Sequence, residues 1–164
     1  MNLVRGVLIQ RDAALACRIG EQELALPEAL TRRLPELARY RDQSVAVGLR
    51  PEHLGVGEGT PGSVLECIVT RTETLGSERL LHANLDAEPV LNDAIIEAAQ
   101  DVDATAVAEL ERESARGEVP VVGRVDSSFE PASNTRLSLT VRTERLQFFD
   151  LETGAAIDAA QAAA

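Results

Sequence analysis

Lysine is absent from this chain of 164 residues, and all 16 of its basic residues are arginines. A complete phosphate-binding P-loop needs a lysine ammonium on the phosphates, so this chain cannot form one. Covalent catalysis through a lysine Schiff base is excluded for the same reason.

Aromatic residues and long apolar runs are also scarce. The chain has no tryptophan, one tyrosine and three phenylalanines. No apolar run approaches the roughly 20 residues of a membrane-spanning helix, and the N-terminus lacks the charged-then-apolar order of a signal peptide. We therefore expect a soluble, cytoplasmic protein. Cys17 and Cys67 lie in apolar, strand-like segments, where two buried thiols are expected rather than a disulfide or a metal site.

The charge is strongly acidic, with a formal net value of −11. Nucleic-acid binding needs a basic footprint that neutralises phosphates, so no nucleic-acid partner is expected. Much of the acid is concentrated in residues 86–118, which hold ten Asp or Glu and two Arg. These side chains are expected to form a solvated helical face rather than a catalytic pair.

Alternation of apolar and other residues predicts many short strands. They are expected at residues 3–10, 14–19, 23–26, 44–50, 64–72, 79–85, 119–125, 137–141 and 146–149. Residues 28–34 are predicted to be helical, and residues 55–62, with four glycines and a proline, to be a loop. This pattern is typical of a mainly β protein built as a small closed or nearly closed barrel. The acidic helices of residues 86–118 are expected as an insertion, and residues 158–164 as a frayed tail.

The corner Arg50-Pro51-Glu52 is a candidate binding or structural feature. Proline fixes its own φ and favours an extended conformation for Arg50. In extended chain, Arg50 and Glu52 would point the same way, and they could either grip a partner or bridge each other as an intramolecular latch.

The pair Phe148-Phe149 leaves two alternatives open. If Leu146 and Phe148 face inward, Phe149 faces outward, and an outward aromatic ring in a chain this poor in aromatics indicates a contact surface. A bulge would instead turn both rings inward. Neither His53 nor His82 has neighbours at metal-ligand spacing, so both are expected to be surface or hydrogen-bonded histidines.

Four segments resemble a known family when taken in order. They are "MNLVRGVLIQ", "VGLRPEHL", "TETLGSERLLHANL" and "RTERLQFFDLETGAAI". Together they resemble the TOBE region, a pair of OB-like β segments that follows the nucleotide-binding domain in ATP-binding subunits of sugar-importing ABC transporters. The resemblance covers residues 1–157 and implies one TOBE/OB-like regulatory domain there, with Met1 internal to a longer parent. The insertion at 86–118 departs from the family pattern.

The resemblance implies a non-catalytic regulatory and dimerisation domain, with no cofactor of its own. The parent would bind ATP and Mg²⁺, form a homodimer, contact membrane permease subunits and receive a regulatory protein at the inner face of the membrane. Arg50, Pro51 and Glu52 would be structural corner residues. The residues implied at the dimer or regulator surface are Glu73, Gly76 and Glu78, from a Glu-x-x-Gly-x-Glu turn, and Phe149, Asp150, Thr153 and Gly154, from a Phe-Asp-x-x-Thr-Gly motif. Phe149 is the foremost interface candidate.

Two other functions stay open. The first is a stand-alone OB-like module that binds a small oxyanion or a sugar. An oxyanion site requires basic groups or helix N-termini, which the acidic balance disfavours. The second is a stand-alone enzyme, for which no nucleophile–base pair can be assembled from the sequence.

Overall fold

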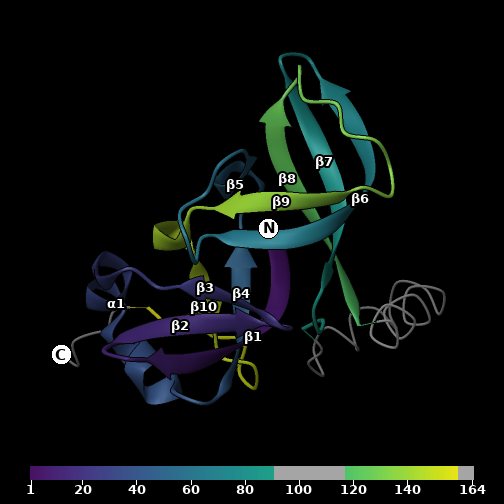
Figure 1. Cartoon of the computed structure of the whole chain (residues 1–164). Coiled ribbons are helices and arrows are strands. Elements are labelled where there is room, and N and C mark those ends of the chain that lie inside the picture. Colours follow the sequence, from purple (N-terminus) through teal and green to yellow (C-terminus); the bar gives the residue numbers. More distant parts are fainter. Residues whose placement is uncertain (91–116, 159–164) are drawn as a thin grey trace, which may run out of the picture.

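The computed structural model describes residues 1–90 and 117–158. In these residues the chain is mainly β, as predicted, with ten strands in two curled five-stranded sheets (Figure 1). The strand order is β10-β4-β1-β2-β3 in sheet one and β5-β9-β6-β7-β8 in sheet two. The curled sheets are those of an OB-like fold, and the predicted fold class is confirmed.

Sheet one contains the first and the last strand of the described residues. Its strands are β1 (Asn2–Arg11), β2 (Ala14–Ile19), β3 (Gln22–Ala25), β4 (Ser44–Leu49) and β10 (Gln147–Phe149). The alternation in β1 buries Val4 and Leu8 and exposes Leu3 and Arg5. A short helix, α1 (Glu28–Arg33), follows β3, and Pro35 then begins a 3-10 helix, η1 (Pro35–Tyr40), which the sequence did not predict.

Sheet two contains one strand that falls in a predicted loop. Its members are β5 (Leu54–Val56), β6 (Val64–Leu75), β7 (Glu78–Asp86), β8 (Glu118–Asp126) and β9 (Arg136–Val141). The prediction of a loop at residues 55–62 is wrong for Gly55 and Val56, which pair with Thr140 and Leu139. A Cβ at Gly55 would lie 3.1 Å from Thr140 Oγ1, so the glycine lets β9 approach closely.

The predicted insertion, at about residues 86–118, begins and ends at the β7–β8 ladder. Asp86 ends β7 and Glu118 begins β8, and the two residues pair with each other. They are strand residues because the β7–β8 ladder continues to the base of the insertion. The predicted helices themselves, at residues 91–116, and residues 159–164 of the predicted tail lie outside the described residues.

Two crossovers connect the sheets. The chain leaves β4 through the 3-10 turn η2 (Pro51–His53) to reach β5, and it leaves β9 through η3 (Thr143–Arg145) to reach β10. The crossovers lie side by side, because the Arg142 amide donates to the His53 carbonyl at 3.0 Å. Any cleft between them is therefore lined by residues that are far apart in the sequence.

Side-chain amides join the sheets in the same way at two places. Asn2 in β1 donates from Nδ2 to the Val122 carbonyl at 2.9 Å and accepts from the Val122 amide at 2.8 Å. Gln22 in β3 donates to the Glu66 carbonyl at 3.0 Å and accepts from the Glu66 amide at 2.5 Å. Each amide thus pairs with the neighbouring sheet as a backbone unit would, and it satisfies polar groups at a strand edge.

The core includes both cysteines as free, buried thiols, as predicted. Burial raises the pKa of Cys17 to about 12 and that of Cys67 to about 11. Both thiols are therefore protonated and unreactive near neutral pH. Within residues 1–90 and 117–158, no helix is long and apolar enough to cross a membrane.

Candidate functional site

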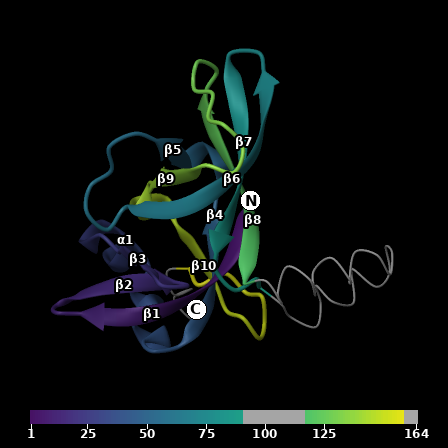
Figure 2. The same ribbon diagram turned by 45° about the vertical axis from the view of Figure 1, so that its right-hand side comes forward.

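The residues singled out from the sequence fall in two distant regions of the fold. Glu73, Gly76 and Glu78 surround the turn between β6 and β7, at the end of sheet two that projects away from sheet one (Figure 2). Arg50, Glu52 and Phe149 instead line a single cleft beside the crossovers. The structure therefore brings the corner and Phe149 together, while Asp150 and Thr153 line a different hollow and the hairpin turn lies apart from both.

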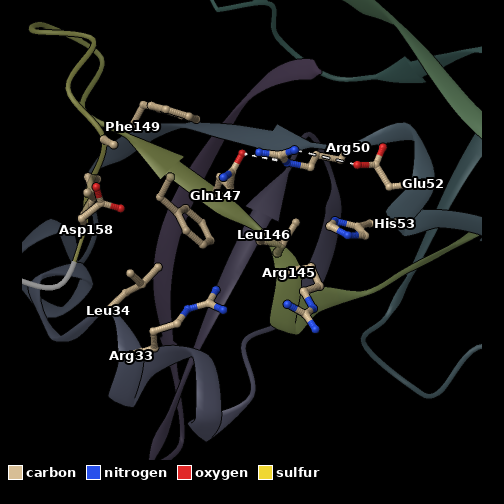
Figure 3. Close-up of a pocket in the computed structure, with 13 residues that line it drawn as sticks. Arg33, Leu34, Arg50, Glu52, His53, Arg145, Leu146, Gln147, Phe149 and Asp158 are labelled. Atoms are coloured by element: carbon tan, nitrogen blue, oxygen red, sulfur yellow. Dashed lines mark hydrogen bonds and ion pairs between the residues drawn. The ribbon is translucent and has the colours of Figure 1, made fainter.

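The cleft, which we call the crossover cleft, has a volume of about 720 Å³. It is lined by η2, η3, β10 and the end of α1 (Figure 3). Its buried apolar residues are Leu34, Leu146, Phe148 and Ile157, and Phe149 and Ala156 are its more exposed apolar residues. Its charged residues are Arg33, Arg50, Glu52, Arg145 and Asp158. The cleft thus combines an apolar floor with a rim that carries more positive than negative charge.

The corner at Arg50 is extended on one side only. Arg50 has φ −79° and ψ 138°, as expected before a proline, but Pro51 begins the 3-10 turn η2 rather than continuing the extended chain. The turn still brings Arg50 Nη1 to 3.9 Å from Glu52 Oε1, while Arg50 Nε donates to Gln147 Oε1 at 3.4 Å. The corner therefore makes the contacts of an intramolecular latch, although its rim side chains remain half exposed.

Glu52 and His53 complete this side of the cleft. The pKa of Glu52 is lowered, first by a hydrogen bond from its own backbone N–H and then by the nearby His53, Arg50 and Arg124. His53 is partly buried, and its Nδ1 has no hydrogen-bond partner among the described residues. The expectation of a surface or hydrogen-bonded histidine is wrong here, because η2 turns the ring back against the fold.

The two adjacent phenylalanine rings lie on opposite faces of β10. Phe148 is 2% exposed, whereas Phe149 is half-buried, so the predicted alternation is confirmed and the bulge alternative is wrong. Phe149 pairs with Ala46, and a Cβ at Gly48 would lie 3.1 Å from Phe149 Cε2. The ring therefore covers a glycine of β4 and keeps its other side open. A partner contact at Phe149 stays a prediction.

Asp150 organises the turn at residues 150–154, which we call the terminal turn. Asp150 Oδ1 accepts hydrogen bonds from the amides of Glu152 and Thr153, at 3.1 and 2.7 Å, and from Thr153 Oγ1 at 2.8 Å. Asp150 Oδ2 accepts a hydrogen bond from the Tyr40 hydroxyl at 3.0 Å. The bonds from Thr153, followed by that from Tyr40, lower the pKa of Asp150. Gly154, at φ +69°, completes the turn.

The turn between β6 and β7 is a two-residue hairpin turn. Leu75 pairs with Glu78, so Gly76 and Ser77 form the turn, and Gly76 has φ +61°, a left-handed conformation that glycine adopts without strain. Leu75 is 56% exposed at its base. We call residues 73–78 the hairpin tip.

Both glutamates of the hairpin tip have local partners. Glu73 contacts Arg71, and its Oε1 lies 3.3 Å from His82 Nε2. Glu78 Oε2 lies 3.3 Å from Arg124 Nε. Apart from the His82 side chain, the side chains of these pairs are substantially exposed. Exposed ion pairs contribute little stability, so each glutamate could instead pair with a residue of a partner protein.

Sequence reasoning missed Arg33 and Arg145 as members of the cleft. Arg33 ends α1 and donates to the Glu144 carbonyl at 3.1 Å, which ties the helix to η3. No local sequence pattern connects these two arginines with Arg50, because only the crossovers bring the three elements together. Among the described residues, no group of three or more His, Cys, Asp or Glu could hold a metal ion.

Comparison with known proteins gives a consistent result. Residues 1–54 match the MalK OB fold domain, and residues 47–116 match the TOBE domain. The chain is also 24% identical over 160 residues to the uncharacterized ABC transporter ATP-binding protein YurJ of Bacillus subtilis (strain 168). The alignment covers 96% of this chain and 35% of YurJ, so the chain spans about a third of the length of this relative.

These matches support a C-terminal OB/TOBE region of an ABC transporter ATP-binding subunit. The two matched domains are non-catalytic C-terminal domains of ABC ATPases, which confirms the prediction that this chain is not itself an enzyme.

Proposed function

We propose that this chain is the regulatory and dimerisation region of the ATP-binding subunit of an ABC importer for sugars. The observation that carries the proposal is the consecutive match to the MalK OB fold domain and the TOBE domain. In this proposal the whole protein binds and hydrolyses ATP with Mg²⁺, and permease subunits hold it at the cytoplasmic face of the membrane.

Two surfaces of the fold suit this role. The hairpin tip presents the exposed Leu75 between two glutamates whose ion pairs can be exchanged. The outer side of Phe149 offers a half-buried aromatic ring, which is a typical anchor for a protein contact. We assign dimer or regulator contacts to these two surfaces.

The dimerisation role is tested with Phe149→Asp in the full-length protein. We expect its dimer dissociation constant, measured by sedimentation, to rise about tenfold because a charge replaces an apolar anchor. The matched control is Ile68→Asp, at a residue that is 38% exposed on β6. Equal weakening by the control would contradict the assignment. Loss of the thermal unfolding transition in Phe149→Asp would show instead that the ring stabilises the fold.

The sugar assignment is tested separately by transport. Deletion of the gene should abolish uptake of a radiolabelled sugar from a panel, and reintroduction of the intact gene should restore it. If the deletion leaves the uptake of every sugar unchanged but abolishes the uptake of an ion or a peptide, the sugar assignment is contradicted. That result would not bear on the proposed dimerisation role.

A further inference from the structure

We propose that the crossover cleft is the docking site for an acidic, partly apolar segment of a regulatory protein. This inference rests on the proposed regulatory function and names the surface and the chemistry of the partner.

The crossover cleft carries more positive than negative charge, whereas the whole chain is acidic. The chain has a net charge of −11, yet Arg33, Arg50 and Arg145 all line this cleft. The opposing carboxylates are those of Glu52 and Asp158, and Glu52 is already engaged by its own backbone and by Arg50. A positive rim on an acidic protein attracts an acidic partner and orients it during encounter.

Arg33 and Arg145 have hydrogen-bond donors that the described part of the fold does not use. A guanidinium carries five N–H donors, and Arg33 gives one bond, to the Glu144 carbonyl. In the part of the chain that the structure describes, the Arg145 side chain makes no hydrogen bond or ion pair. Both side chains line the same cleft (Figure 3). They can therefore receive carboxylates in the paired geometry that arginine favours.

The apolar floor of the crossover cleft favours a polypeptide segment over a small ion as its occupant. Leu146 and Phe148 form an apolar floor, and Phe149 stands half-buried at its edge. Arg50 belongs to a different element from Arg33 and Arg145, so the donors line a broad cleft of about 720 Å³ rather than surround one oxyanion. A segment with apolar side chains between glutamates or aspartates meets both the floor and the rim.

The test measures fluorescence anisotropy of a labelled peptide that alternates glutamate with leucine and phenylalanine. The peptide is titrated with the full-length protein and with the double variant Arg33→Gln, Arg145→Gln. We expect the wild type to bind, the variant to bind at least about tenfold more weakly, and added salt to weaken the wild-type interaction. The double variant Arg18→Gln, Arg136→Gln removes the same charge from exposed positions outside the cleft, and its affinity should stay within about twofold of the wild type.

Several outcomes would overturn the proposal. They are absence of peptide binding to the wild type, equal weakening in the control variant, and equal binding by a peptide with glutamine in place of glutamate. Complete competition by inorganic phosphate would identify a small-anion site instead. Weaker self-association of Arg33→Gln, Arg145→Gln would identify a second copy as the occupant. Weaker self-association of this variant would be compatible with the proposed dimerisation function. Conversely, a negative result in the sugar-uptake test or in the Phe149→Asp test would contradict the proposed function without changing the result of the peptide titration.

Discussion

The hairpin tip and the terminal turn contain the same kinds of residue, but the fold uses them differently. Each has acidic side chains and a glycine at positive φ. In the terminal turn, the Asp150 carboxylate accepts bonds from three groups of the same turn and from Tyr40. At the hairpin tip, Glu73 and Glu78 make exposed ion pairs. The same kind of motif can therefore stabilise a turn in one place and leave groups open to a partner in another.

The cause of this difference is the surroundings of each turn. The terminal turn lies against η1, where the Tyr40 hydroxyl donates to Asp150. The chain then returns beside β10, where the Ile157 amide donates a hydrogen bond to the Phe148 carbonyl. The hairpin tip projects from sheet two, away from sheet one (Figure 2). The first turn is thus integral to sheet one, whereas the second is a peripheral surface.

The largest expected effect comes from breaking the joint between the sheets that carry these two regions. Asn2→Ala removes three hydrogen bonds and leaves both polar groups of the Val122 backbone unpaired. We expect the free energy of unfolding to fall by about 2–3 kcal/mol, measured by urea denaturation. Gln10→Ala, which removes one local bond on the surface, should change it by less than about 0.5 kcal/mol. Equal effects would show that the core alone holds the sheets together.

The comparison itself is tested by Asp150→Ala and Glu73→Ala. Asp150→Ala should lower the free energy of unfolding by about 1–2 kcal/mol, because capping-type bonds to backbone amides are lost. Glu73→Ala should change it by less than about 0.5 kcal/mol, because its ion pair with Arg71 is exposed. Comparable losses in calorimetry or urea titration would mean that the hairpin tip is as integrated as the terminal turn.

The same residue predicts a pH dependence with a definite sign. The native pKa of Asp150 is lowered, so its stabilising contribution is present above the ordinary carboxyl pKa and is lost as pH falls through the lowered value. The stability advantage of the wild type over Asp150→Asn should therefore shrink between about pH 5 and about pH 2. A constant difference over this range would contradict the role of the ionised carboxylate.

The two turn glycines provide a test of local backbone conformation. Gly76 and Gly154 have φ of +61° and +69°, and an added Cβ would meet no atom within 4 Å at either position. Alanine at each should therefore cost about 1 kcal/mol of unfolding free energy, and asparagine should cost less. Unequal losses in thermal denaturation would show that the surroundings of the two turns affect even their local conformation.

Much of the fold could be predicted from local patterns. Period-two alternation located β1, β2, β7 and β8 closely, and the glycine at residue 76 marked the hairpin turn. The three-residue strand β5 escaped because it contains a glycine and follows a proline turn, so only its pairing with β9 makes it a strand. The predicted insertion, at about residues 86–118, takes in Asp86 and Glu118, whose pairing is a tertiary contact that local patterns do not show.

By itself, the sequence determined where most of the strands lie, and that a lysine-free chain cannot carry a P-loop or Schiff-base lysine. The tertiary structure alone decided how ten strands divide between two sheets, and it alone brought Arg33, Arg50 and Arg145 to one cleft. Alternation along a strand records which side chains face inward, but it carries no information about the strand or helix that packs beside it. The arginine cleft depends on two crossovers whose residues are remote in sequence, so it exists only once both sheets have closed.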